Sequence, residues 1–598
     1  MSRSKRLSVV REDTAMNLIS GTVEPRKEQR NGLIVEWDVP IPMRDGSVLY
    51  CDIYRPDSEG QFPVLMSHGP YAKGLSFAEG YPAQWNMLTR DHPEVAQGTT
   101  TEFANWETAD PERWVPYGYI CIRVDSRGSG MSPGYVDPFS AQETQDYYDC
   151  IEWAAEQVWS TGKIGLAGVS YYAMNQWQVA AQKPPHLAAI CPFEGASDYY
   201  RDAVRHGGIM STFFVRWYPM QVTNAQFGLG SKGRKNPVTG RSIAGEVDLS
   251  DEERAANRTD IRADYLAHDL ITDRFFQDRI AALEEIEVPV LSCGNWGGQG
   301  LHLRGNVEGF LRAGSDQKWL ELHGLEHWTE FYTDYGVALQ KQFFDHFLKG
   351  EDNGWDSRPP VLLQVRHIDK FVEREESEWP LARTDWTKFY LDTTRMALTT
   401  TAPAEAQEVS FRAKDQVLTF RSAPLDQPTE ITGPMMAHLV ASSTTTDADL
   451  FVSVRVFDPE DKEVLFVGAV DPNAPISLGW LRASHRKLDP ARSEPYRPVH
   501  AHDEVQPLVP GQFYDLDVEI WPSSIVVPKG YVIALSIGGK DYDNGLPEPM
   551  PQIYGVSQRG CSVFLHDDEK DRPDGTFDGT TTLRTGDAYV MLPVIPAK

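Results

Sequence analysis

The sequence predicts two successive domains: an α/β domain with a mostly parallel sheet and an inserted helical cap, followed by an all-β domain of the jelly-roll type. Short apolar runs alternate with helical stretches over residues 31–200 and again over 286–350, which is typical of βαβ crossovers. Residues 201–285 are helical and irregular in pattern, and β-type segments separated by turn residues dominate 351–598. The boundaries of the expected domains follow these changes.

The α/β pattern begins after a polar N-terminal arm of residues 1–30. A strand–turn–strand pattern comes first, with its turn at 43–46. Buried-type strands and amphipathic helices then alternate. The expected strands are 63–69, 118–125, 163–170 and 186–195, and the helices between them include 142–157 and 175–182. Ser250 and Glu253 form a capping box before a polar helix of the expected cap. The sheet resumes at 288–296 and 318–324, and the helix 337–350 closes the domain.

The composition describes an ordinary folded protein and excludes several classes of function. The formal net charge of −29 leaves nothing to offset repulsion from phosphates, so no nucleic-acid partner is expected. No apolar run reaches the length of a signal peptide or a membrane span, and we expect a cytoplasmic protein without a membrane partner. The six cysteines stand singly, mostly within apolar runs, as reduced core thiols do.

The segment Gly168–Ala173 is the strongest chemical feature of the sequence. It reads Gly-Val-Ser-Tyr-Tyr-Ala and lies between a predicted strand and a predicted helix. A serine on such a sharp turn presents its hydroxyl above the sheet, and the backbone N–H of the next residue points to where an oxyanion forms. This context predicts a nucleophilic Ser170 in an α/β-hydrolase fold.

A serine nucleophile needs a base, usually a histidine, which in this fold follows the last parallel strand. His327 lies between that strand and the closing helix and is the expected base. His323 falls at the end of the strand itself and is assigned a structural role.

The chain resembles the cocaine-esterase-like CocE/NonD branch of the X-Pro dipeptidyl-peptidase superfamily. The resemblance spans most of the sequence. The matching segments are MRDGSVLYCDIYRP, PVLMSHGPYAKG, GYICIRVDSRGSGMSPG, GVSYYAMNQWQVAA, LHGLEHW, FRSAPL, ITGP, DADLFVSVRVFDPE and GWLRASHR. It implies a hydrolase domain, a helical cap and a jelly roll. It also implies that the hydroxyl of Tyr71, in a Pro-Tyr-x-Lys segment, serves with the N–H of Tyr171 as the oxyanion hole.

The third member of the expected triad is where the chain departs from this family. The family places its acid in a Trp-Tyr-Asp segment, and here Gly297 stands at the aspartate position. Glu194, at the end of the preceding strand, is the favoured replacement, and Asp198 is an alternative. Glu326 or Asp334 near His327 is a further alternative, and a dyad without any acid is the last.

The expected reaction is acyl transfer from a small-molecule ester or amide to water, with no cofactor and no metal. His500, His502 and Asp503 are explained by alternation along a strand rather than by a metal site. The candidate residues of the substrate pocket are Phe213, Phe214, Trp217 and Trp296.

Three other functions stay open from the sequence. A dipeptidyl peptidase would need a carboxylate such as Asp202 or Glu308 in the pocket to hold a free amine. An acyltransferase would use the same acyl-enzyme, and a catalytically silent binding protein would explain Gly297. Association into a homo-oligomer is also open.

Overall fold

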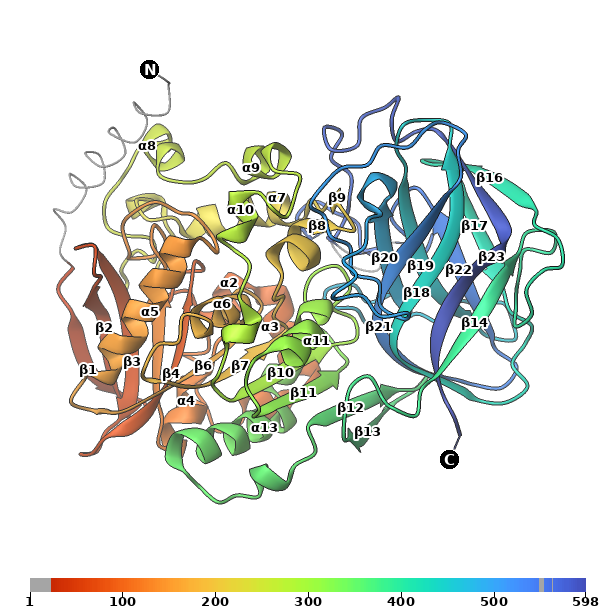
Figure 1. The fold of residues 1–598 in the computed structure, drawn as a ribbon. Helices are drawn as coiled ribbons and strands as arrows, with labels where there is room; N and C mark the ends of the chain where they lie inside the picture. The colour runs from red at the N-terminus through yellow and green to blue at the C-terminus, as the bar shows by residue number, and fades with distance from the viewer. Residues whose placement is uncertain (1–22, 548–552, 562, 598) are drawn as a thin grey trace.

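The computed structural model describes residues 23–547, 553–561 and 563–597, and shows an α/β domain beside an all-β domain (Figure 1). Most of the expected N-terminal arm lies outside the described residues. Its last part forms strand β1 (Arg26–Arg30), which pairs antiparallel with β2 (Leu33–Pro42) at one edge of the first sheet. The chain therefore enters the sheet a few residues earlier than the polar pattern suggested.

The first sheet has eleven strands, and its centre is parallel. After β1 and β2 the strands lie in this spatial order: β3 (Val48–Pro56), β5 (Ile120–Asp125), β4 (Phe62–Gly69), β6 (Ser160–Val169), β7 (Leu187–Phe193), β10 (Val290–Asn295), β11 (Lys318–His323), β12 (Val361–Arg366) and β13 (Phe371–Glu376). The order changes direction around β4 and β6, so ligands are expected at the carboxyl ends of these strands.

Both faces of this sheet are buried, as expected for a parallel sheet. Neighbouring residues of one strand, such as Leu65 and Met66 of β4, belong to different apolar clusters. Helix α5 (Ala141–Ala155) contributes to one cluster and α13 (Asp334–Phe344) to the other. The remaining helices of this domain are α2 (Phe77–Gly80), α3 (Pro82–Asp91), α4 (Pro111–Trp114), α6 (Tyr171–Ala180), α11 (Leu303–Arg312) and α12 (Thr329–Tyr332).

The cap lies over the carboxyl ends of the strands and is built from short pieces (Figure 1). They are the hairpin β8 (Arg205–His206) and β9 (Ile209–Met210), and the helices α7 (Phe213–Trp217), α8 (Asp251–Ala256), α9 (Ile261–Ala267) and α10 (Arg274–Gln277). The capping box of Ser250 and Glu253 is confirmed at the start of α8.

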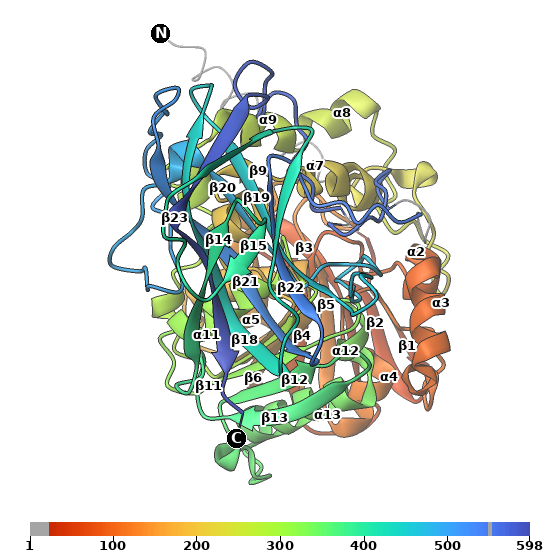
Figure 2. The same ribbon diagram turned by 90° about the vertical axis from the view of Figure 1, so that its right-hand side faces the viewer.

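The second domain is an all-β unit whose sheet closes on itself, because β14 pairs with both β15 and β23 (Figure 2). Its strands are β14 (Asp385–Asp392), β15 (Ala397–Thr399), β16 (Glu408–Arg412), β17 (Val417–Arg421), β18 (Thr429–Ser443), β19 (Asp449–Phe457), β20 (Ser477–Arg482), β21 (Tyr514–Val527), β22 (Val532–Gly538) and β23 (Thr580–Ile595). The expected fold class is confirmed. Strands β12 and β13 follow residue 351 but pair into the first sheet, and the closed sheet of the all-β unit begins with β14.

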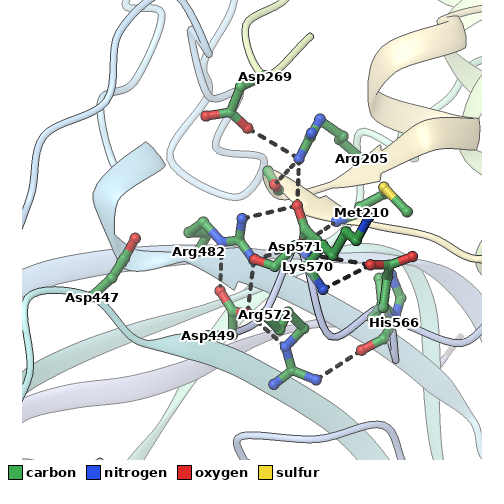
Figure 3. A network of polar contacts seen from close by, with 12 residues as sticks. Arg205, Met210, Asp269, Asp447, Asp449, Arg482, His566, Lys570, Asp571 and Arg572 are labelled. Atoms are coloured by element: carbon green, nitrogen blue, oxygen red, sulfur yellow. Dashed lines mark hydrogen bonds and ion pairs between the residues drawn. The ribbon is translucent and has the colours of Figure 1, made fainter. Parts of the chain in front are cut away.

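A buried polar network joins the cap to the all-β domain (Figure 3). Asp571 binds Arg482 of β20 at 2.8 Å and Arg205 of β8 at 3.0 Å. Arg482 also binds Asp449 at 2.9 Å, and Asp449 in turn accepts from Arg572. These charged side chains are buried together and form ion pairs with one another. The pairs hold the cap in one position against the second domain.

No helix among the described residues is long and apolar enough to cross a membrane. All six cysteines are described, and each is buried and free of a disulfide.

Candidate active site

Ser170 stands on a strained turn between β6 and α6. Its backbone has φ 58° and ψ −113°, a conformation that L-residues rarely adopt and that is often kept at functional sites. A hydrogen bond to the neighbouring strand holds the turn in place, since the N–H of Ser170 donates to the carbonyl of Phe193 at 3.1 Å. A side chain on Gly168 would overlap Tyr172, so the tight crossing of strand and helix requires glycine there.

His302 contacts the hydroxyl of this serine. Its Nε2 lies 3.1 Å from Oγ of Ser170, within hydrogen-bond distance. His302 is the N-cap residue of α11, which follows β10, and its side chain is almost fully buried. Burial lowers the pKa of His302 well below its ordinary value, and the charge of His327 adds to this effect. A neutral imidazole beside a serine hydroxyl can take its proton.

Glu194 lies behind His302. Its Oε2 is 3.9 Å from Nδ1 of His302, and neither atom has a hydrogen-bond partner among the described residues. The backbone of Glu194 has φ 54°, and its N–H donates to the carbonyl of Cys293 at 2.7 Å. The carboxylate is completely buried. The series Ser170–His302–Glu194 has the order of nucleophile, base and orienting acid.

Backbone fills the space beside Gly297, the position where the resemblance placed the family's acid. A Cβ on Gly297 would lie 2.5 Å from Cα of Gly468, in a loop of the all-β domain. The N–H of Ala469 donates to the carbonyl of Gly297 at 2.9 Å and holds the two segments together. No side chain can occupy position 297 without moving this loop.

His327, the base expected from the sequence, faces the same space but binds a different partner. Its Nε2 is 2.9 Å from Oε1 of Glu107, and its Nδ1 has no partner among the described residues. Burial raises the pKa of Glu107 to about 7, against the lowering effect of the bond to His327. The rings of His302 and His327 lie 5.7 Å apart, so two histidines flank the serine rather than one.

Tyr71 and Tyr171, the two residues expected to form the oxyanion hole, are found near Ser170. Tyr71 lines the cavity that contains Ser170, and its hydroxyl accepts a hydrogen bond from Nε1 of Trp217 at 3.1 Å. Accepting that bond leaves the phenolic hydrogen free to donate. Burial raises the pKa of Tyr71 well above its ordinary value, which keeps the group protonated. Tyr171 is the first residue of α6, and the first N–H groups of a helix lack intrahelical acceptors.

Comparisons with known proteins agree with this architecture. The family model for X-Pro dipeptidyl-peptidase (S15 family) matches residues 45–329, and the model for the X-Pro dipeptidyl-peptidase C-terminal non-catalytic domain matches 353–573. The solved structure of a CocE/NonD family hydrolase from Staphylococcus aureus is 31% identical, with a TM-score of 0.80, and the match covers 97% of this chain and 98% of that one.

This chain belongs to the CocE/NonD family of hydrolases. Cocaine esterase from Rhodococcus sp. is 27% identical over 71% of this chain and 81% of its own length. A putative serine esterase from Mycobacterium bovis is 25% identical over 84% of this chain and 90% of its own. The protein is thus a serine hydrolase of small-molecule substrates, as the sequence predicted.

In this CocE/NonD hydrolase the cavity that contains Ser170 has a volume of about 240 Å³, and its lining combines aromatic side chains with polar ones that include Arg234. The hydrolase domain supplies Ser170, the cap supplies Phe213 and Trp217, and the all-β domain supplies Tyr554 and Phe564. Phe214 does not line the cavity but packs behind it, 5.0 Å from the ring of Phe213. Trp296 also lies elsewhere, where its Nε1 donates to the carbonyl of Gln364 at 2.8 Å.

The alternative acids are engaged away from the two histidines. Asp198 caps a turn of the cap by accepting from the N–H groups of Tyr200 and Arg201, and also binds the guanidinium of Arg201 at 2.7 Å. Glu326 accepts from Thr329 at 2.9 Å. Asp334 pairs with Arg113.

Asp202 and Glu308, the carboxylates that a dipeptidyl peptidase would need in the pocket, are both neutralised by arginines outside it. Asp202 binds Arg304 at 2.8 Å, and Glu308 pairs with Arg497.

Sequence reasoning missed His302 and Glu107. One feature of the sequence could have pointed to His302. It stands at the start of a helix that follows a parallel strand, at the carboxyl ends of the strands, where Ser170 also lies. Glu107 carries none, since it comes from an irregular loop whose position is fixed only by the fold.

Proposed function

We propose that this hydrolase cleaves an ester or amide of a small or medium-sized apolar acid through an acyl-enzyme on Ser170. In this proposal His302 is the general base and Glu194 orients it. The observation that carries the proposal is the 3.1 Å contact between Oγ of Ser170 and Nε2 of His302 inside an aromatic cavity. His327, the base expected from the sequence, has its Nε2 bound to Glu107 and becomes a second histidine of the cavity.

The first half of the reaction transfers the acyl group. Nε2 of His302 takes the hydroxyl proton as Oγ of Ser170 attacks the carbonyl carbon. The hydroxyl of Tyr71 and the N–H of Tyr171 donate to the oxyanion that forms. As the tetrahedral intermediate collapses, the imidazolium of His302 returns the proton to the leaving alcohol or amine.

The second half releases the acid. Water attacks the acyl-enzyme, His302 takes its proton, and the proton then returns to Oγ of Ser170. In both halves the imidazolium on His302 faces the buried Oε2 of Glu194, which has no other partner among the described residues. A buried carboxylate at this place stabilises the imidazolium that forms on the base in the transition state.

The lining of the cavity favours a neutral, apolar acyl group. Aromatic side chains from three parts of the chain surround it, as is usual for apolar ligands. Among the described residues, Glu107 is the one carboxylate that lines the cavity, and it is already bound to His327. A substrate with a free N-terminal amine would find no free carboxylate here, so we favour esterase or amidase activity over dipeptidyl-peptidase activity.

The test compares the two histidines directly, using p-nitrophenyl esters of several acyl lengths. His302→Gln and His327→Gln are matched, because each replaces a buried imidazole of the same cavity. We expect Ser170→Ala and His302→Gln to lose about 10³-fold or more in kcat, as removal of a triad member does. We expect His327→Gln to lose less than about 10-fold, because its hydrogen bond orients Glu107 rather than the base.

Three outcomes would contradict the proposal. The reverse order of the two histidine variants would return the role of base to His327. Transfer of the acyl group to an added alcohol in preference to water would make the protein an acyltransferase. Failure of Ser170 to react with an organophosphonate would favour a silent binding protein.

We further propose a reducing, cytoplasmic location. Six buried free thiols without a disulfide fit such a compartment, where thiols stay reduced. Measuring the cell fraction that holds the protein tests this directly, and recovery from a secreted fraction would refute it.

A further inference from the structure

A buried histidine stands between two carboxylates directly behind the proposed triad. Glu321 and His323 are two residues apart on β11, so their side chains lie on the same face of the sheet. Nδ1 of His323 is 2.7 Å from Oε2 of Glu321, and its Nε2 is 3.0 Å from Oε1 of Glu194. All three side chains are at most 1% exposed.

This arrangement requires a charged imidazole. An ionised carboxylate only accepts hydrogen bonds, so a histidine that meets one at each nitrogen must donate from both and carries a positive charge. Burial opposes that charge, but the carboxylates of Glu321 and Glu194 outweigh it and hold the pKa of His323 well above its ordinary value. Burial in turn raises the pKa of Glu321, and the cation of His323 opposes that rise.

The same bonds decide which way Glu194 faces. Oε1 is held by His323, which leaves Oε2 as the oxygen turned toward His302, 3.9 Å from Nδ1. The backbone is held as well, at φ 54° and by the bond from its N–H to Cys293. Hydrogen bonds of this kind are often long in the free enzyme and shorten when the base becomes charged.

We propose that Glu321 and His323 are positioning residues that complete a buried relay, Glu321–His323–Glu194–His302–Ser170, in which the bond from His323 to Oε1 keeps Oε2 of Glu194 aimed at the base. This inference rests on the proposed role of His302 and extends it by two residues that do not touch the substrate. The relay ends at Tyr335, whose hydroxyl is 3.2 Å from Oε1 of Glu321.

A purely structural role for His323 would make a different prediction. The trio would then stabilise the sheet, and its loss would lower the melting temperature without changing how the folded enzyme responds to pH. A positioning role changes the pH profile. The groups that face His302 are Glu194, His327 and, beyond them, Glu107 and His323.

The decisive experiment is the pH profile of kcat/KM for His323→Gln, with active sites counted by organophosphonate labelling. Removing the cation of His323 takes away a positive charge behind Glu194 and so stabilises the imidazolium of His302. This effect moves the acid limb of the profile to higher pH. We expect that shift together with a fall of about 10- to 100-fold in kcat, the usual size for a group that orients a reacting one, and little change in KM.

Two further variants keep the inference testable. Glu321→Gln keeps a hydrogen-bond acceptor for His323 but removes one negative charge, so we expect a smaller fall in kcat than for His323→Gln. We also expect Glu321→Gln to remain folded even if His323→Gln does not fold. His438→Gln is the matched control, because it breaks an imidazole–carboxylate pair of 2.7 Å with Asp517 in the all-β domain. It should leave both kcat and the pH profile as in the wild type.

The outcomes separate this inference from the proposed function. If His302→Gln is inactive while folded His323→Gln and Glu321→Gln match the wild type in kcat and in pH profile, the relay is refuted and the triad stands. If His302→Gln remains active, the proposed function fails, whatever the His323 variant does.

Discussion

Gly297 and Gly468 approach each other so closely that a Cβ on Gly297 would lie 2.5 Å from Cα of Gly468. Gly297 lies two residues after the end of β10 in the hydrolase domain, and Gly468 lies in a loop of the all-β domain. The hydrogen bond from Ala469 to the carbonyl of Gly297 fixes this contact. The second domain therefore fills the space that a side chain at position 297 would need, which is the position where the resemblance placed the family's acid.

Gly297→Asp should destabilise the protein and should not raise its activity. The new side chain meets backbone rather than a flexible side chain, so the loop has to move, at a cost of about 1–3 kcal/mol. Thermal unfolding and ester hydrolysis check this. Gly350→Asp is the control, because that glycine is left-handed with open space around it and reports backbone strain alone. A Gly297→Asp variant that is as stable as the wild type and faster would place the acid back at 297.

Glu194→Gln should abolish most turnover. The amide carries no charge to stabilise the imidazolium of His302, and loss of the orienting acid costs up to ~10⁴-fold in kcat in serine hydrolases. Asp198→Asn is the matched variant. It weakens the turn that Asp198 caps and lowers the melting temperature, but its folded fraction should keep nearly full kcat. Turnover per phosphonate-labelled site is the measurement, and equal loss in both variants would contradict the assignment of Glu194.

Tyr71→Phe should lower kcat by about 10²–10³-fold, the usual effect of losing one oxyanion donor. Substrate binding should change little, because the ring and its packing against Trp217 remain. Tyr172→Phe is the control, since this neighbouring tyrosine packs edge-on against Tyr71 but does not line the cavity. A Tyr71→Phe enzyme with normal kcat would remove Tyr71 from the oxyanion hole.

Asp571→Asn should loosen the contact between cap and all-β domain. Two buried arginines, Arg482 and Arg205, would lose their shared anion. Breaking a buried ion pair in this way lowers the free energy of unfolding by about 3 kcal/mol or more. Both arginines outweigh the effect of burial and hold the pKa of Asp571 well below its usual range. The stability it contributes is therefore complete above about pH 4, the unfolded value, and is lost as pH falls through the folded value.

Denaturant unfolding at neutral and acidic pH measures this difference. The gap between wild type and Asp571→Asn should be largest near pH 7 and should narrow at the lowest pH values at which the protein still folds. Asp567→Asn removes a half-exposed pair with Arg216 nearby and should change stability by less than about 1 kcal/mol. A gap that does not vary with pH would mean that Asp571 acts through packing and not through its charge.

The sequence by itself determined the fold class and predicted Ser170 as the nucleophile. Both are local, because the period of the apolar residues distinguishes strands from helices and the strand–Ser170–helix turn is contained in a few residues. The same locality explains why the pattern after residue 350 does not say which sheet its first strands join. Strands β12 and β13 are β-type like those that follow, and only their pairing with β11 assigns them to the first sheet.

Only the tertiary structure decided which groups surround Ser170. His302, Glu194, His323 and Glu107 come from four separate segments, and their distances depend on how strands β7, β10 and β11 align and on how the second domain closes over Gly297. A histidine or glutamate side chain is long enough to reach the serine from several of these segments. Residue type alone therefore leaves many histidines and carboxylates as candidates for the base and the acid, and the packing of the fold decides which of them lie near Ser170.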